Sequence, residues 1–239
     1  MAAFTISHGK GGGVGQIALP KAHWEALTPE TRQAFRRVAG LDFVSQFYLA
    51  GGTGLALHLG HRFSADLDFF SPASDAVGPE VRAELREVLG GPTLSIVHDK
   101  DGTFSAMWQE VGISFFRLHL YPLVRQPVLI EGVPVATVAE IGAMKLAAII
   151  DRGTRKDLVD LYYILQQVPI KDLFEVAAVK YSRVRTFAVS ATRGLAYFDD
   201  AEVLPMPLMI DRTPWAEMKR FLENEAMATG RKRLEDLWR

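Results

Sequence analysis

The spacing of apolar and polar residues divides the chain into a first part with mixed strands and helices and a second part that is mainly helical. Apolar residues at helical spacing predict helices from Pro29 to about Val44 and from Glu80 to Leu89. Short apolar runs predict strands at residues 47–50, 66–70, 93–98, 104–109 and 113–120, with a further extended piece at 133–135.

The pattern changes at residue 137, where Thr137 and Glu140 form the capping box of a helix that ends near Arg152. A second helix is predicted from Lys156 to Gln167, and helical spacing continues afterwards except at the proline-rich stretch 204–207. The chain is therefore expected to be α/β (α+β), with a core at residues 1–136 and a helical domain at 137–239.

Residues 48–70 carry the main functional signal, and they read as strand, helix and strand. The first strand stops at Gly51 and Gly52, where the backbone can turn sharply and approach a ligand closely. Thr53 then opens a helix, which directs unpaired N–H groups and the Thr53 hydroxyl outward. The start of this helix is therefore predicted to bind phosphate.

The second strand contains Asp66 and Asp68, two residues apart. Side chains alternate across a strand, so both carboxylates face one side, about 6 to 7 Å apart, while Leu67 and Phe69 face the other. Paired carboxylates suit Mg²⁺ or Mn²⁺, although an Asp-x-Asp sequence alone is usually incidental. The glycine turn favours a site for a nucleoside triphosphate and its metal.

These residues resemble the nucleotidyltransferase signature, a glycine turn followed by Asp-x-Asp on the next strand. More narrowly, Gly51-Gly52-Thr53 with Arg62, Ser64 and the sequence Asp66-Leu67-Asp68 resembles the AbiEii/AbiGii family of nucleotidyltransferase toxins. The resemblance implies a nucleotidyltransferase-fold mixed sheet in which Arg62 and Ser64 brace the aspartate strand or contact the nucleotide.

A second polar series follows on two consecutive predicted helices. Taken alone, Lys145, Arg152, Asp157 and Asp160 are more typical of a solvated helix face with exposed ion pairs than of a binding site. The same toxin family has a lysine and then Arg-Asp-x-x-Asp-Leu after its core, and Lys156 stands here in the usual arginine position. The resemblance implies that Lys145 contacts the triphosphate and that Asp157 and Asp160 orient it or anchor the helix pair.

A third carboxylate, which nucleotidyltransferases usually place on a later core strand, is missing from the predicted strand 113–120. Alternation places Arg117 and His119 on one face of this strand, so one of them is expected at the vacant position. His119 is the candidate general base, and Glu110, just before the strand, is the fallback.

Composition limits the setting of this chemistry. The 239 residues include no cysteine, which excludes disulfides, thiolate metal sites and cysteine nucleophiles. No apolar run is long enough to span a membrane, and no signal-peptide core begins the chain, so a cytoplasmic protein without a membrane partner is expected. The net charge of −1 requires any nucleic-acid surface to be local.

One glycine-rich stretch and one basic stretch are weaker signals of function. The stretch from His8 to Gly15 lacks the order of a P-loop and is interpreted as a flexible lead-in. From Val176 to Phe198 the charged residues are all basic, namely Lys180, Arg183, Arg185 and Arg193. This pattern could contact an RNA backbone, but an ordinary basic helix face explains it as well.

The resemblance implies a toxin that transfers a nucleoside monophosphate from a nucleoside triphosphate to an acceptor, with Mg²⁺ held by Asp66 and Asp68. It also implies a cognate antitoxin protein and makes transfer RNA the candidate acceptor. Two alternatives remain open. One is a phosphohydrolase of the haloacid-dehalogenase type, which the residues after Asp68 do not match; the other is a catalytically decayed protein that only binds nucleotide or a partner.

Overall fold

A computed structural model describes residues 21–237 of the chain. The glycine-rich stretch from His8 to Gly15 lies outside the described residues, so its interpretation as a lead-in stays a prediction.

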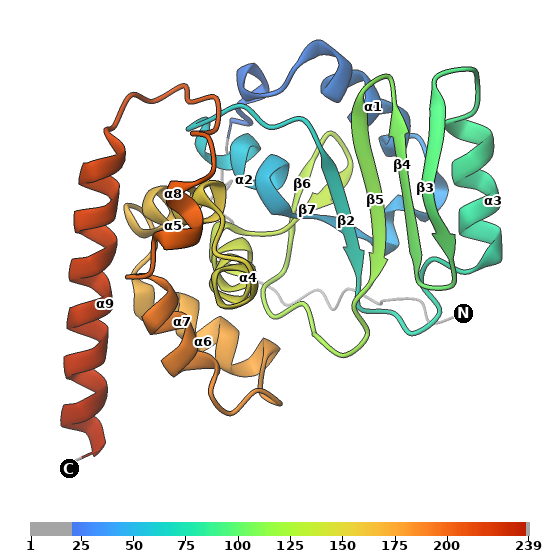
Figure 1. Cartoon of the computed structure of the whole chain (residues 1–239). Coiled ribbons are helices and arrows are strands. Elements are labelled where there is room, and N and C mark those ends of the chain that lie inside the picture. The colour runs from blue at the N-terminus through green and yellow to red at the C-terminus, as the bar shows by residue number, and fades with distance from the viewer. Residues whose placement is uncertain (1–20, 238–239) are drawn as a thin grey trace, which may run out of the picture.

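The described residues contain a seven-stranded mixed sheet with the strand order β3-β4-β5-β2-β1-β7-β6 (Figure 1). Strands β2 and β5 pair in parallel, as do β1 and β7, and the other neighbouring strands are antiparallel. The mixed sheet confirms the predicted fold class. The strands are β1 (Tyr48–Leu49), β2 (Leu67–Ser71), β3 (Leu94–Lys100), β4 (Thr103–Trp108), β5 (Val111–Arg117), β6 (Val128–Ile130) and β7 (Val133–Val135).

Two strand predictions need correction. The short strand β6, which pairs with β7 at the edge of the sheet, was not predicted, because three residues give too little alternation to be recognised. The strand predicted to reach residue 120 ends at Arg117. The chain then turns, and the N–H of Tyr121 donates to the carbonyl of Leu118.

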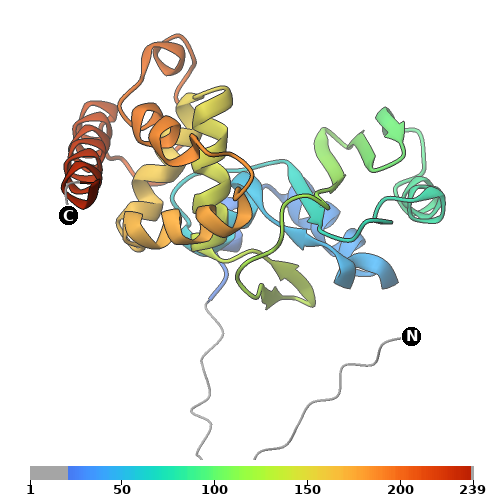
Figure 2. The same ribbon diagram turned by 90° about the horizontal axis from the view of Figure 1, so that it is seen from below.

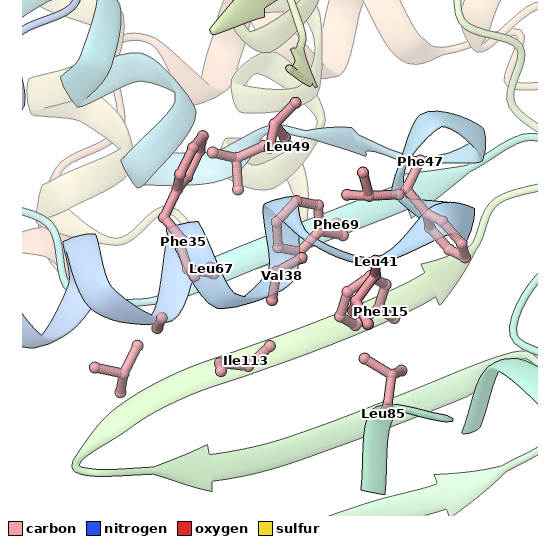
Figure 3. Close-up of a cluster of buried hydrophobic side chains, with 14 of the residues drawn as sticks. Phe35, Val38, Leu41, Phe47, Leu49, Leu67, Phe69, Leu85, Ile113 and Phe115 are labelled. Carbon is pink, nitrogen blue, oxygen red and sulfur yellow. The ribbon is translucent and has the colours of Figure 1, made fainter. Parts of the chain in front are cut away.

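One face of the sheet packs against α1 (Pro29–Ala39), and α3 (Pro79–Val88) adds to the same hydrophobic cluster. Figure 3 shows Phe35 and Val38 of α1 among Phe69 of β2 and Phe115 of β5, and all four side chains are fully buried. The rings of Phe69 and Phe115 stack with centroids 4.7 Å apart. The predicted helix from Pro29 to about Val44 is in fact α1 followed by a 3-10 turn at residues 42–46.

The remaining helices lie on the side of the structure away from β3, β4 and α3, as Figures 1 and 2 show. They are α2 (Gly51–Leu59), α4 (Val138–Asp151), α5 (Arg155–Leu165), α6 (Ile170–Lys180), α7 (Phe187–Gly194), α8 (Asp199–Glu202) and α9 (Trp215–Leu237). The secondary-structure elements assigned within residues 138–237 are all helices, and the domain boundary at residue 136 stays a prediction. The hydrophobic cluster of these helices also includes Tyr48 and Leu55 from before residue 136, so the two parts share buried surface.

The start of α4 shows one half of the predicted capping box and lacks the other. The Thr137 hydroxyl accepts a hydrogen bond from the Glu140 N–H at 3.3 Å, as expected. The Glu140 carboxylate instead accepts from the backbone N–H groups of Val124 and Arg125 and lies 2.7 Å from Lys180 Nζ. Glu140 therefore ties the loop before β6 to α4 and α6, which local sequence spacing does not reveal.

Candidate nucleotide site at the start of helix α2

The two aspartates meet the backbone of glycines from neighbouring elements. Leu67 and Phe69 are fully buried on one side of β2, whereas Asp68 is half-buried and Asp66 exposed, as the alternation predicted. A Cβ on Gly51 would lie 2.8 Å from the Asp68 carboxylate, and one on Gly112 would lie 2.6 Å from that of Asp66. Gly112 on β5 was not singled out in the sequence, because only the β2–β5 register brings it to Asp66.

The electrostatics of the pair favour a bound cation. Burial raises the pKa of Asp68, and the nearby charge of Asp66 raises it further. Each unit of such a shift is about 1.4 kcal/mol of unfavourable interaction with the ionised form, which a cation between the carboxylates would offset.

The glycine pair follows β1 closely, as predicted, but Gly51 and Gly52 are the first two residues of α2. Gly51 has φ +64°, a left-handed conformation that glycine adopts without strain, and the Ala50 N–H donates to the Asp68 carbonyl at 3.0 Å. No side chain among the described residues caps the start of α2. The first N–H groups of α2 therefore have no intrahelical acceptor, and they lie at the end of the helix dipole that favours anions.

Thr53 has a different role from the one predicted. The residue is 1% exposed. Its hydroxyl donates to the backbone carbonyl of Asp66 and lies 2.8 Å from the Ser64 hydroxyl. The prediction that this hydroxyl points outward is wrong, because α2 already begins at Gly51 and the third residue of the helix turns toward β2. Thr53 instead fixes the position of the chain at Asp66.

Cationic side chains complete one wall of a cavity of about 160 Å³. The cavity brings together segments far apart in sequence, and its polar lining consists of Gly51, Gly52, Arg62, Ser64, Asp66, Asp68, Lys145, Arg152 and Lys156. Seven of these nine residues belong to the predicted site. Arg152 was named in the sequence only as part of the polar series on the two helices, and Lys156 only as a departure from the family pattern. Lys156 is exposed and forms no salt bridge with the described residues, which leaves its charge available to a ligand.

Lys145 is held in this cavity by two fully buried carboxylates. Its Nζ lies 2.8 Å from Asp157 Oδ1 and 2.6 Å from Asp160 Oδ2, and Lys145 is 6% exposed. Burial alone would lower the pKa of Lys145, but the charges of Asp160 and Asp157 raise it, so the ammonium stays charged. The solvated-face alternative is therefore wrong, and the orienting role predicted for both aspartates fits the geometry.

Asp160 also holds Arg62, whose guanidinium donates from Nε at 2.6 Å and from Nη2 at 2.9 Å. The buried ring of His61 contacts the same carboxylate at 2.8 Å through Nε2, and its burial lowers the pKa of His61. Burial alone would raise the pKa of Asp160, but Lys145 and Arg62 lower it well below the usual range. His61 was missed in the sequence, because nothing local links it to a residue 99 positions away.

The structure does not bring the predicted base to the carboxylates. Because β5 ends at Arg117, His119 lies in an exposed turn and outside the residues that line the cavity. Arg117 pairs with Asp101 at 2.7 Å, away from the site. The strand alternation used to select Arg117 and His119 is therefore wrong; Asp68 pairs in register with Ser114, which occupies the expected place of a third carboxylate.

Glu110, the fallback base, also lies outside the cavity lining. It is exposed in the two-residue turn between β4 and β5, where Gln109 and Glu110 have φ values of +47° and +66°. No group of three or more histidine, aspartate or glutamate residues within residues 21–237 is placed to hold a metal ion. Asp66 and Asp68 are the two carboxylates among the residues that line the cavity.

The basic stretch after Val176 is only partly available to a ligand. Lys180 is 1% exposed and its Nζ lies 2.7 Å from the Glu140 carboxylate, so this lysine is structural. Arg183, Arg185 and Arg193 are exposed, and the interpretation of these three as an RNA contact stays a prediction. None of the helices in the described part of the chain combines enough length with enough apolar character to cross a membrane.

The mixed sheet, the glycine turn and the carboxylate pair define a nucleotidyltransferase fold. Solved structures support this class: JHP933 from Helicobacter pylori has a TM-score of 0.55 and 18% identity, covering 89% of this chain and 100% of that one. MenT4, a nucleotidyltransferase toxin from Mycobacterium tuberculosis H37Rv, has a TM-score of 0.55 and 17% identity, covering 91% and 90% of the two chains.

The family follows from the sequence match over most of the chain. Residues 36–238 match the family described as "Nucleotidyl transferase AbiEii toxin, Type IV TA system". An uncharacterised protein of Aquifex aeolicus (strain VF5), aq_aa25, is 29% identical over an alignment of 205 residues that covers 83% of this chain and 95% of that protein. The chain belongs to the AbiEii family of nucleotidyltransferase toxins, and a type IV toxin–antitoxin system implies an antitoxin as its partner.

Proposed function

We propose that this protein transfers a nucleoside monophosphate from a nucleoside triphosphate to a hydroxyl group of an acceptor, with transfer RNA as the candidate acceptor. The observation that carries the proposal is the composition of the cavity of about 160 Å³, where an uncapped helix start, two carboxylates and the cations Arg62, Lys145, Arg152 and Lys156 converge. This combination suits a triphosphate and its metal better than any uncharged ligand.

The residues present fit Mg²⁺ or Mn²⁺. Asp66 and Asp68 supply carboxylate oxygens, and a positive charge beside them would offset the burial and the repulsion from Asp66 that raise the pKa of Asp68. Mg²⁺ usually binds through one or two carboxylates together with substrate phosphates and water, so a third protein carboxylate is not required for binding. When bound, such an ion neutralises charge that develops on the transferred phosphoryl group.

The chain's own residues have separable tasks in the transfer. The N–H groups at Gly51 and Gly52 and the side chains of Arg62 and Lys156 bind the phosphates that become pyrophosphate. Lys145, fixed by its two aspartates, provides a positive charge at the boundary between the transferred and the departing phosphate. The acceptor oxygen bonds to the α-phosphorus as the bond to the bridging oxygen breaks, pyrophosphate leaves, and the hydroxyl proton passes to water.

One observation favours a second candidate, a decayed protein that binds nucleotide without transferring it. Ser114 stands in register beside Asp68, where a carboxylate general base would be expected, and no histidine lines the cavity among the described residues. We prefer the transferase because the glycine turn, both aspartates and the supported lysine are all in place. Binding alone would not need a lysine held by two buried carboxylates.

Incubation of the purified protein with each nucleoside triphosphate, Mg²⁺ and total RNA tests the choice. Label incorporated into RNA with equal release of pyrophosphate is expected for the wild type and should be lost in Asp68→Asn. Asp75→Asn, an exposed aspartate in the loop after β2, is the matched control and should retain full transfer. Triphosphate binding without pyrophosphate release from any acceptor would establish the decayed alternative instead.

A further inference from the structure

Helix α9 has one buried face, and the opposite face is free. The helix packs on the rest of the protein through Met218 and Leu222, which are both 0% exposed, and through Ala226. Figures 1 and 2 both show α9 at the margin of the molecule, where no other described element covers its outer side. This outer face is therefore open to a partner.

The large apolar side chains that α9 exposes within residues 215–235 lie on this outer face. Met227 is 52% exposed and Leu234 is 60% exposed. At about 100° per residue, Met227 lies roughly opposite Met218 and Leu222 on the helix. Leu234 follows seven residues later and shares the side of Met227. A Cβ on Gly230, which lies between them, would meet no atom of the described residues within 4 Å, so there is room beside Met227 for a side chain of a partner.

Two opposite charges flank Met227 at equal distances along the helix. Glu223 precedes it by four residues, Arg231 follows it by four, and both are exposed. The salt bridge that α9 makes within the described part of the chain is a different one, between Lys219 and Glu202 at 2.6 Å. The charges of Glu223 and Arg231 are therefore available to another molecule.

This arrangement is complementary to a second copy of itself that runs in the opposite direction. In an antiparallel pair of α9 helices centred on Met227, each residue lies at the level of the residue equally far on the other side of Met227 in the second copy. Arg231 then meets Glu223 of the second copy, and the twofold symmetry forms this ion pair twice. Leu234 meets the methylene stem of Arg220. Residues 223, 227 and 231 form one i±4 ridge, the kind of ridge that helices most often pack together.

Charge selects this orientation against the alternative. A parallel pair would place Glu223 against Glu223 and Arg231 against Arg231, and such like-charge contacts are unfavourable. An unrelated partner would not require opposite charges placed symmetrically about one apolar residue. The surface therefore fits a second copy of this chain better than a different protein.

We propose that the outer face of α9 is a self-association surface, through which two copies of this chain form a twofold dimer with antiparallel α9 helices that cross at Met227. One helix from each copy makes a small contact, so the dimer is expected to be weak and to weaken further with salt. No described residue of α9 lines the cavity of about 160 Å³, and the inference is independent of the proposed function.

A single introduced thiol tests the position of the twofold axis, because the chain has no cysteine. In the proposed dimer the two copies of Met227→Cys face each other within the distance that a disulfide spans. Air oxidation with a copper catalyst should therefore link this variant into a covalent dimer on non-reducing electrophoresis. The matched control is Val179→Cys on α6, which has a similar exposure of 54% and should stay monomeric.

Charge reversal tests the pairing of the helices. Sedimentation velocity of the full chain at low salt, from about 1 to 300 µM protein, should show the wild type shifting towards twice the mass of one chain. Glu223→Arg and Arg231→Glu should each raise the dissociation constant by about tenfold or more, because each places like charges against one another. The control is Lys232→Glu, the same change on the adjacent exposed residue, which lines a separate hollow beside α6 and should leave dimerisation unchanged.

An equimolar mixture of Glu223→Arg and Arg231→Glu gives the decisive result. One variant carries only positive charge at the two positions and the other only negative charge. The mixture should therefore form a heterodimer although neither variant pairs with itself. The chain with both substitutions should regain the homodimer, because the ion pair is restored with its members exchanged.

Four results would overturn the inference. They are a wild type that stays monomeric at the highest concentration, dimers that Arg231→Glu leaves unchanged, a mixture of the two charge variants that stays monomeric, or equal cross-linking of Met227→Cys and Val179→Cys. All substituted residues are exposed, so each variant is expected to keep the circular dichroism spectrum and thermal midpoint of the wild type. These experiments do not measure transfer, so a failure of the proposed function would leave their outcome unaffected.

Discussion

Replacement of Asp160 by asparagine tests the view that a buried carboxylate holds the cationic side of the site. Asp160 is fully buried, and its oxygens lie within 2.9 Å of Lys145 Nζ, of Arg62 Nε and Nη2, and of His61 Nε2. Asparagine has nearly the same shape but no charge, and it directs an N–H donor at groups that are themselves donors. Two buried cations therefore lose their shared counter-charge.

Removing one member of a buried ion pair costs about 3 to 5 kcal/mol of unfolding free energy. With a urea dependence of about 2 to 3 kcal/mol/M, the unfolding midpoint of Asp160→Asn should fall by roughly 1 to 2.5 M. Circular dichroism and tryptophan fluorescence in urea measure this shift. Asp75→Asn, an exposed aspartate, is the control and should leave the midpoint unchanged within error. A shift of Asp160→Asn below ~0.3 M would refute the reasoning, because the carboxylate would then be dispensable.

The same substitution predicts a pH dependence with a definite sign. The pKa of Asp160 in the folded protein lies well below the ordinary value near 4, so its stabilising effect is fully present above about pH 4 and declines as pH falls further. The difference in unfolding free energy between wild type and Asp160→Asn should therefore be constant from pH 7 to 5. Between about pH 4 and 3 it should shrink by roughly 1 kcal/mol. A difference that grows in acid would contradict the assignment.

Other positions give further predictions. Asp66→Ala and Asp68→Ala should each abolish transfer without lowering the thermal midpoint, because burial and mutual repulsion raise the pKa of Asp68. Mg²⁺ with triphosphate should raise the thermal midpoint of the wild type only. A variant that keeps wild-type transfer would refute the metal assignment. Lys145→Ala should raise the KM for triphosphate far more than Lys100→Ala in β3. It should also lower stability, since two buried carboxylates lose a partner. Equal kinetics of the two variants would argue against a phosphate contact. Thr53→Val should lower stability by about 1 to 3 kcal/mol and reduce kcat, because the carbonyl of Asp66 loses a buried donor; unchanged thermal midpoint and kcat would show that the hydroxyl does not position Asp66.

Much of the site was predictable because its central part is local in sequence. Gly51, Gly52, Asp66 and Asp68 lie within one strand-helix-strand unit, where turn chemistry and the period of a strand fix their relative positions. The same local rules identified the mixed sheet followed by helices. They failed for Thr53, since a shift of two residues in the start of α2 turns its hydroxyl from solvent to Asp66.

Only the tertiary structure decided which distant groups complete the site. Sequence spacing cannot show that Asp160 reaches His61 and Arg62 across about a hundred positions, because that contact depends on how α5 packs against the end of α2. The β2–β5 register placed Ser114 beside Asp68, whereas counting along the predicted strand had favoured His119. Strand ends and pairing registers are set by long-range packing. The alternation of side chains along one strand therefore determines which residues share a face, but it does not determine which residues of the neighbouring strand they meet.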